Sequence, residues 1–140
     1  MKDYILQSSK IRCAEIYARL LRTLTKDKYY LSPDVTAAKL AQQIDCTPRY
    51  ISAAVQIATG HNFSALLNTL RLREACRRLA SPTYAQRTVE EVGMTCGYRS
   101  RQAFYTAFSR HLDCTPLQWR NQASSGKRTD IPSSLKDPTA

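Results

Sequence analysis

The sequence lacks long apolar runs, and glycine is rare, with 4 in 140 residues. No run approaches the roughly 18 residues that a membrane-spanning helix requires. The start, MKDYILQSSK, has neither the apolar core nor the small-residue cleavage site of a signal peptide. Scarce glycine and few turn positions favour helices over sheets. We therefore expect one all-α domain with tails, in a cytoplasmic protein without a membrane partner.

Cysteine and histidine are present, but they lack the spacing of a functional site. The five cysteines form no CxxC pair and no Cys/His group at metal-binding spacing, so we expect reduced, mostly buried thiols. His61 and His111 each stand alone in the sequence. Because no Cys/His/acid constellation exists, we expect no catalytic residue, no metal and no cofactor, and a protein that is not an enzyme.

Lysine is absent between Thr47 and Arg120, where ten arginines face four acidic residues. The whole chain carries a formal charge of +10, which favours a polyanionic partner. Arginine binds phosphate and guanine edges with two hydrogen bonds, whereas lysine supplies a point charge. The restriction to arginine therefore favours nucleic acid, and an ordinary solvated basic surface is the alternative interpretation.

Apolar residues recur with helical period between about Ser8 and Lys26, at positions 13, 16, 17, 20 and 24. This pattern predicts an amphipathic helix, with residues 1–30 as an N-terminal helix and its connection. Pro33 and the polar residues around it separate this segment from the next. From residue 123 onward the composition shifts to Ser, Gly, Lys, Asp and Pro, so we expect residues 123–140 to be a disordered tail.

An internal repeat organises the middle of the chain. LAQQIDCTPRYISAAV (40–55) matches VGMTCGYRSRQAFYTAF (92–108) in its apolar, small and capping positions. Each copy reads as a short helix, a tight turn and a helix with one polar face, which is the helix-turn-helix plan. A small residue in the first helix, Ala41 or Gly93, lets the two helices approach closely.

Capping residues fix the expected element boundaries. Thr47 and Thr115 precede a proline that suits the first helical position, and Thr88 with Glu91 forms a capping box. We predict a first helix-turn-helix over about 36–60, a linker helix over 62–80, a second helix-turn-helix over 88–112 and a last helix over 115–121. The linker helix carries four arginines that we expect to be mostly outward and solvated: Arg71, Arg73, Arg77 and Arg78.

The segment GYRSRQAFYTAFSRHLDCTPLQWR (97–120) resembles the C-terminal signature of the AraC/XylS family of bacterial transcription regulators. The first half of the chain also agrees with the family pattern, in LAQQI, in YIS before TG, and in NF. The resemblance therefore covers about residues 30–122, and we assign the DNA-binding domain to 31–122. Asp113, Val55 and Gly93 depart from the common pattern, and Gly93 weakens its helix by about 1 kcal/mol. The resemblance implies a seven-helix domain, with two helix-turn-helix subdomains joined by the linker helix. The helix predicted from the apolar pattern at about 8–26 lies before this domain as an extra N-terminal helix.

The resemblance further implies sequence-specific binding of double-stranded DNA, with each recognition helix in a major groove. The base-facing positions of the family correspond here to Arg49, Ser52, Ala53, Gln56, Arg101, Gln102, Tyr105 and Thr106. Positions suited to phosphate contacts are Thr47, Arg99, Ser100 and Arg110. Phe104, Phe108 and Trp119 are expected in the core, and Tyr50 and Tyr98 suit either packing or base stacking.

A second hypothesis makes the chain a protein-interaction or dimerisation domain, with weak or no specific DNA binding. In that case residues 8–26 would dock on a sensor domain or on a second copy, and the chain would be a fragment of a longer sensor-regulator. Neither the operator, the sign of regulation nor the upstream signal follows from the residues.

Overall fold

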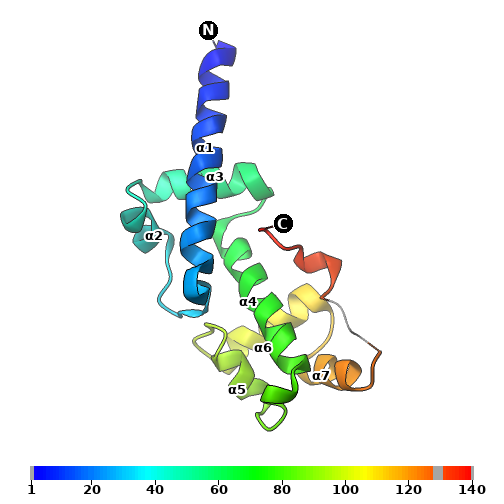
Figure 1. Cartoon of the computed structure of the whole chain (residues 1–140). Coiled ribbons are helices and arrows are strands. Elements are labelled where there is room, and N and C mark those ends of the chain that lie inside the picture. The colour runs from blue at the N-terminus through cyan, green and yellow to red at the C-terminus, as the bar shows by residue number, and fades with distance from the viewer. Residues whose placement is uncertain (1, 128–130, 140) are drawn as a thin grey trace. The chain divides into compact units, whose positions relative to one another are not determined.

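The computed structural model describes residues 2–127 and 131–139, and over these residues the chain is helical without a strand (Figure 1). It folds as two compact units. The first contains the chain up to Tyr30 together with Asp34–Leu67, and the second contains Leu31–Pro33 with Asn68–Pro138. The predicted all-α class with two helix-turn-helix subdomains is confirmed.

The first unit is built from α1 (Lys2–Thr25), α2 (Ala37–Gln43), α3 (Pro48–Thr59) and the start of α4 (Phe63–Ala80), with a 3-10 turn at Lys26–Leu31 after α1. Helix α1 packs against α3. The buried side chains of this unit include Cys13, Ile16, Leu20, Leu24, Leu40, Ala41, Ile44, Ile51, Ala54 and Val55. The apolar face of α1 thus supplies four of these ten buried side chains, at positions 13, 16, 20 and 24, and it packs on α3 within the first unit.

Side-chain caps set the ends of these helices. The Thr36 hydroxyl accepts a hydrogen bond from the Lys39 amide at 3.1 Å at the start of α2. Thr47 caps α3, with Pro48 at the first helical position, and Gly60 ends that helix with a φ of 76°. Asp45, with a φ of 59°, takes the left-handed conformation in the turn between α2 and α3. Ala58 is exposed, although it follows the buried Ile51 and Val55 at helical spacing.

The second unit contains most of α4, α5 (Val89–Met94), α6 (Arg101–Leu112) and α7 (Pro116–Ser124), with short 3-10 turns at Pro82–Tyr84 and Ser133–Leu135. Its core includes Leu72, Ala75, Cys76, Leu79, Val89, Val92, Cys96, Tyr98, Phe104, Phe108, Leu112 and Trp119. Two capping boxes are present: the expected one, in which Thr88 pairs with Glu91, and a second, in which Thr115 pairs with Gln118. The three aromatic residues expected in the core lie there, and the indole of Trp119 donates to the Cys76 carbonyl at 3.2 Å.

The C-terminal segment differs from the expected disordered tail. Helix α7 continues to Ser124, and Leu135 is fully buried, at 0% exposure, in the core of the second unit. Ser134 donates to the His111 carbonyl at 3.2 Å, and Arg73 donates to the Leu135 carbonyl at 2.5 Å. Polar composition predicted disorder, but Leu135 is buried in this core and Ile131 packs against it. Residues 128–130 and 140 of the predicted tail lie outside the described residues.

The arginines of α4 are not a solvated row. Arg71 is buried and donates to the Ser32 carbonyl at 2.8 Å, with its guanidinium over the Tyr98 ring. Glu74, whose side chain is only 2% exposed, pairs with Arg77 at 2.7 Å and with Arg78 at 3.0 Å. A carboxylate taken out of water requires such partners. The expectation of outward arginines was therefore wrong for Arg71, and Arg77 alone of these residues is classed as exposed.

Candidate nucleic-acid interface

The outer face of α3 presents polar side chains from a helix whose opposite face is packed. Arg49, Ser52 and Gln56 are exposed and repeat at helical spacing, while Ala53 is half-buried. Ile51, Ala54 and Val55 hold the helix from within, each at 1% exposure or less. Three of the four predicted base-facing residues of this unit thus share one exposed face, and Ala53 lies at its edge.

The second recognition helix, α6, has the same plan. Arg101, Gln102, Ala103 and Thr106 are exposed, while Phe104 and Phe108 are fully buried beneath them. Ser100 caps the helix by accepting from the Ala103 amide at 3.1 Å. The first turn therefore begins at a fixed place, with the Arg101 and Gln102 side chains directed away from the core.

Tyr105 is the candidate whose surroundings differ most from a free helix face. It is half-buried, and its hydroxyl donates to a carboxylate oxygen of Glu90 on α5 at 2.5 Å. The same hydrogen bond lowers the pKa of Glu90 and raises the pKa of Tyr105. Glu90 was not predicted as a site residue, because the sequence shows it only as part of the first turn of α5.

The predicted phosphate ligands lie at helix starts and on exposed turns. Thr47 and Ser100 accept hydrogen bonds from amides of their own helices, so each hydroxyl proton is directed away from those bonds. Arg99 precedes the Ser100 cap, and Arg110 lies in the last turn of α6; both are exposed. Helix N-termini and arginines of this kind are suited to phosphate oxygens.

Exposure divides the ten arginines between Thr47 and Arg120 into two groups. Arg71, Arg73, Arg78 and Arg120 donate to carbonyl or side-chain oxygens of the second unit and hold its structure. The exposed arginines are Arg49, Arg77, Arg87, Arg99, Arg101 and Arg110. Of these, Arg77 pairs with Glu74 and Arg87 lies over the Tyr84 ring. Arg49 lies on α3 in the first unit, and in the second unit Arg101 and Arg110 lie on α6 and Arg99 just before it.

The turn of the second helix-turn-helix is tied to α4. Arg78 donates to the hydroxyl of Thr95, the C-cap of α5, at 2.8 Å. Gly97 has a φ of 93°, and a β-carbon there would lie 2.5 Å from the Arg71 side chain, so no larger residue fits without a shift. Tyr98 is buried and donates to Asn68 at 2.9 Å, which makes it a packing residue and not a stacking surface.

Two large side chains of α3 are exposed. Tyr50, for which the sequence left packing and stacking open, is 46% exposed, and Ile57, which the sequence did not single out, is 58% exposed. Tyr50 directly follows Arg49 in the first turn of α3. Both lie on the helix that carries the first predicted reading face. Apolar side chains on such a face are suited to contact with the methyl group of thymine in the major groove.

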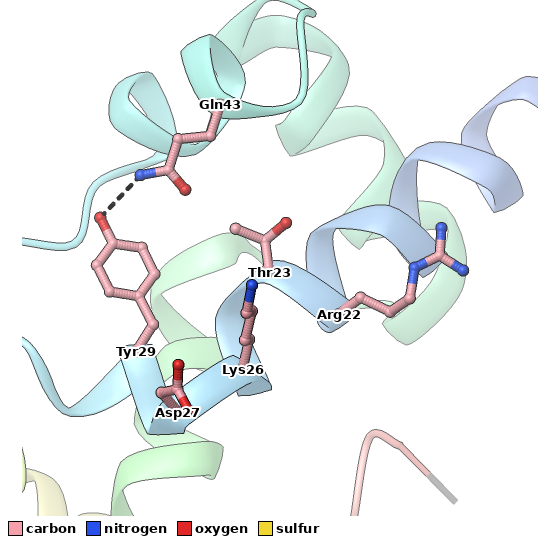
Figure 2. Close-up of a pocket in the computed structure, with 6 residues that line it drawn as sticks. All are labelled: Arg22, Thr23, Lys26, Asp27, Tyr29 and Gln43. Carbon is pink, nitrogen blue, oxygen red and sulfur yellow. Dashed lines mark hydrogen bonds between the residues drawn. The ribbon is translucent and has the colours of Figure 1, made fainter.

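A polar pocket of about 550 Å³ lies in the first unit at the end of α1, apart from any predicted site residue (Figure 2). Its lining comes from α1, the following 3-10 turn and the end of α2: Arg22, Thr23, Lys26, Asp27, Tyr29 and Gln43. The Gln43 amide donates to the Tyr29 hydroxyl at 3.3 Å across it. With two cations and one carboxylate, it has no chemistry that selects a ligand class.

Comparison with known proteins identifies the family. Residues 40–122, more than half of the chain, match the family described as a helix-turn-helix domain. The chain therefore belongs to the AraC-type helix-turn-helix family. Sequence-specific DNA binding in the regulation of transcription is the function of this domain, and the family is not typically enzymatic.

Several solved structures share the fold. The C-terminal domain of AraT, a response regulator from Geobacillus stearothermophilus, is 24% identical with a TM-score of 0.70, over 79% of this chain and 88% of that one. An AraC-type transcriptional regulator from Chromobacterium violaceum is 18% identical with a TM-score of 0.67, over 77% and 94%. A DNA-binding transcriptional dual regulator from Escherichia coli K-12 is 17% identical with a TM-score of 0.66, over 79% and 93%. No curated protein sequence matches the chain.

The described part of the chain also bears on metal sites and membrane spans. Over residues 2–127 and 131–139, His, Cys, Asp and Glu side chains form no group of three that could hold a metal ion. Among the same residues, no helix combines the length and the apolar character that crossing a bilayer demands. The five cysteines are free thiols: three are buried and two are half-buried.

Proposed function

We propose that the chain regulates transcription by placing α3 and α6 in major grooves of duplex DNA, with Arg49 and Arg101 as the main base-reading residues. The observation that carries this proposal is the repeated design: a capped helix with a buried apolar face and an exposed polar face occurs in each unit. Arginine pairs with guanine O6 and N7, which gives about 1–3 kcal/mol of discrimination per bidentate contact. Gln56 and Gln102 are suited to adenine in the same way.

Ser52, Ala53, Tyr105 and Thr106 complete the proposed reading faces, and Thr47, Arg99, Ser100 and Arg110 the phosphate contacts. Helix α4 has 18 residues, a length of about 27 Å at 1.5 Å per residue, which is of the order of the 34 Å repeat of DNA. We therefore propose that one chain contacts two half-sites in successive grooves, over the proposed domain 31–122.

The test is an anisotropy titration with a duplex selected from a random pool. We expect the selected duplex to compete far better than random DNA. Arg101→Ala should relax preference at one base pair, because it removes a base contact. Arg110→Ala is the matched control: it should weaken all sequences alike and reduce the salt slope by about one. A selected duplex that cannot outcompete random DNA would rule out the proposal.

The exposed face of α1 supports a second candidate function, docking of a sensor domain or a second copy through residues 8–26. The face that suggested this in the sequence is packed on α3, but Ile11 is 55% exposed, and Ala14 and Ala18 are also exposed. Deleting α1 would remove core of the first unit, so Ile11→Glu is the appropriate change. If a second copy docks here, this substitution lowers the mass found by light scattering; an unchanged mass, equal to one chain in both proteins, rejects self-association.

We also infer that the protein acts without catalysis or a cofactor and in the bacterial cytoplasm, where chromosomal DNA is accessible. The support for this is the family, whose domain is a DNA-binding module.

A further inference from the structure

The hydrogen bond between Tyr105 and Glu90 connects the reading face of α6 to α5. The Tyr105 hydroxyl donates to Oε1 of Glu90 at 2.5 Å, and the two residues lie 15 positions apart. The Tyr105 ring packs beside the fully buried Phe104, with 6.0 Å between ring centroids. Ring and hydroxyl are therefore both held, and Tyr105 is less mobile than an ordinary exposed tyrosine.

This bond determines which hydrogen-bonding role remains to Tyr105. A tyrosine hydroxyl has one proton, and here that proton is committed to the Glu90 carboxylate. What remains on the phenolic oxygen is acceptor capacity. The bond from Tyr105 keeps the pKa of Glu90 below its usual range, and the nearby Arg101 acts in the same direction, so the carboxylate is ionised at neutral pH.

The bases differ in what they offer to an acceptor in the major groove. Only cytosine, through N4, and adenine, through N6, present a hydrogen-bond donor there, whereas guanine and thymine present acceptors at O6, N7 and O4. An oxygen that acts only as an acceptor can form a hydrogen bond with cytosine or adenine. The lone pairs of guanine and thymine repel it.

We propose that Glu90 is a specificity-determining positioning residue, which fixes Tyr105 as an acceptor and so makes α6 select adenine or cytosine at the base pair beneath Tyr105. This inference rests on the proposed function of α6 as a recognition helix. It gives a role to a carboxylate that, judged by charge alone, opposes binding to phosphate. Arg101 lies one helical turn before Tyr105, and its charge helps to lower the pKa of the same carboxylate. In the proposed function, Arg101 contacts the neighbouring base.

The experiment measures base preference at single positions of the selected duplex. Each base pair is replaced in turn by the three others, and affinity is followed by anisotropy. The wild-type chain should prefer adenine or cytosine at one position by about fivefold or more. Tyr105→Phe should abolish that preference and leave the other positions unchanged, because it removes the acceptor and keeps the ring.

Glu90→Gln tests the positioning role directly. A glutamine amide can donate to the phenolic oxygen and leave the tyrosine proton to a base, so preference should shift toward guanine or thymine at that position. Glu91→Gln is the matched control, since it removes the same charge one residue away and glutamine still serves the capping box. The control should keep the wild-type preference at every position.

The outcomes separate this inference from the proposed function. If Tyr105→Phe and Glu90→Gln both keep the wild-type preference at every position, the inference is wrong and the proposed function stands. An equal loss of affinity for all duplexes in Glu90→Gln would show a structural brace only and also overturn it. A wild-type chain that fails to distinguish the selected duplex from random DNA overturns both. Should Glu90→Gln fail to fold by circular dichroism, a Tyr105→Phe variant that keeps the wild-type preference would still overturn the inference.

Discussion

Gly93→Ala is expected to destabilise the second unit, although alanine favours helices. Gly93 lies in α5, and a β-carbon on it would be 2.2 Å from Cδ2 and 2.5 Å from Cγ of Phe104. To restore a contact of 3.4 Å the ring would have to move by about 1.2 Å (3.4 minus 2.2), within a fully buried environment. Glycine is thus required where the first helix of the second repeat crosses the recognition helix.

The sign of the effect follows from two opposing magnitudes. Replacing glycine by alanine in a helix contributes about 1 kcal/mol of stability. Overpacking a dense core costs about 1–3 kcal/mol, and a rigid ring displaced by its edge belongs to the upper part of that range. We expect a net loss of about 1–2 kcal/mol in the free energy of unfolding.

Urea denaturation followed by Trp119 fluorescence measures this loss of unfolding free energy in the second unit. Trp119 is the only tryptophan in the sequence and is buried in the same core, with its ring 6.5 Å from that of Phe108. Combining Gly93→Ala with Phe104→Leu should restore part of the stability, with a coupling of about 0.5–3 kcal/mol. A single variant that equals or exceeds the wild type in stability would refute the close packing of Gly93 on Phe104.

Three further predictions follow from the contacts of the second unit. Leu135→Ala should lower the free energy of unfolding by about 2–5 kcal/mol, because the side chain is fully buried; an unchanged urea midpoint would show that this segment does not contribute to the core. Arg78→Ala should lower the free energy of unfolding by about 1.5–3 kcal/mol, since it removes a charged partner of the buried Glu74. Arg77→Ala is the control in the same denaturation series. Because the Arg77 side chain is 58% exposed, its loss should lower the free energy of unfolding by less than about 1 kcal/mol. Burial and Arg110 lower the pKa of His111 in the folded chain, so the unfolded chain takes up its proton first and stability should fall as pH drops below about 6.5. Melting curves between pH 8 and pH 5 measure this slope, which should be smaller in His111→Gln; an equal slope in both proteins would exclude His111 as its source.

The elements most predictable from the sequence are those with local signals. Thr47, Thr88 and Thr115 were read as caps from the sequence, and α3, α5 and α7 begin at the residues that follow them. Such caps act between residues two or three positions apart, so the sequence alone contains them. The repeat likewise predicted which faces of α3 and α6 are buried, because apolar spacing identifies a face directly.

What the sequence could not show depends on residues far apart in the chain. The pattern of α1 identified an apolar face but not that α3 covers it. Arg71 looked solvated because its acceptor is the carbonyl of Ser32, 39 positions away. Glu90 gained its significance only when the packing of α5 on α6 brought it to Tyr105. Composition predicted a disordered tail, because averaging over a polar segment conceals the buried Leu135.

The roles of the predicted DNA contacts remain predictions, although their exposure is compatible with them. Arg49, Gln56, Arg101 and Gln102 are exposed on capped helices, as reading residues must be. Tyr105 is the exception, since its hydroxyl is already engaged within the protein.

The most direct test of the account is to select duplexes from a random pool with the wild-type chain, Arg49→Ala and Arg101→Ala, and to compare base preference position by position. Two clusters of preferred bases should appear about 10 base pairs apart, one helical turn. Arg49→Ala should relax one cluster and Arg101→Ala the other. A single cluster, or two variants that relax the same position or none, would contradict the claim that both α3 and α6 read DNA.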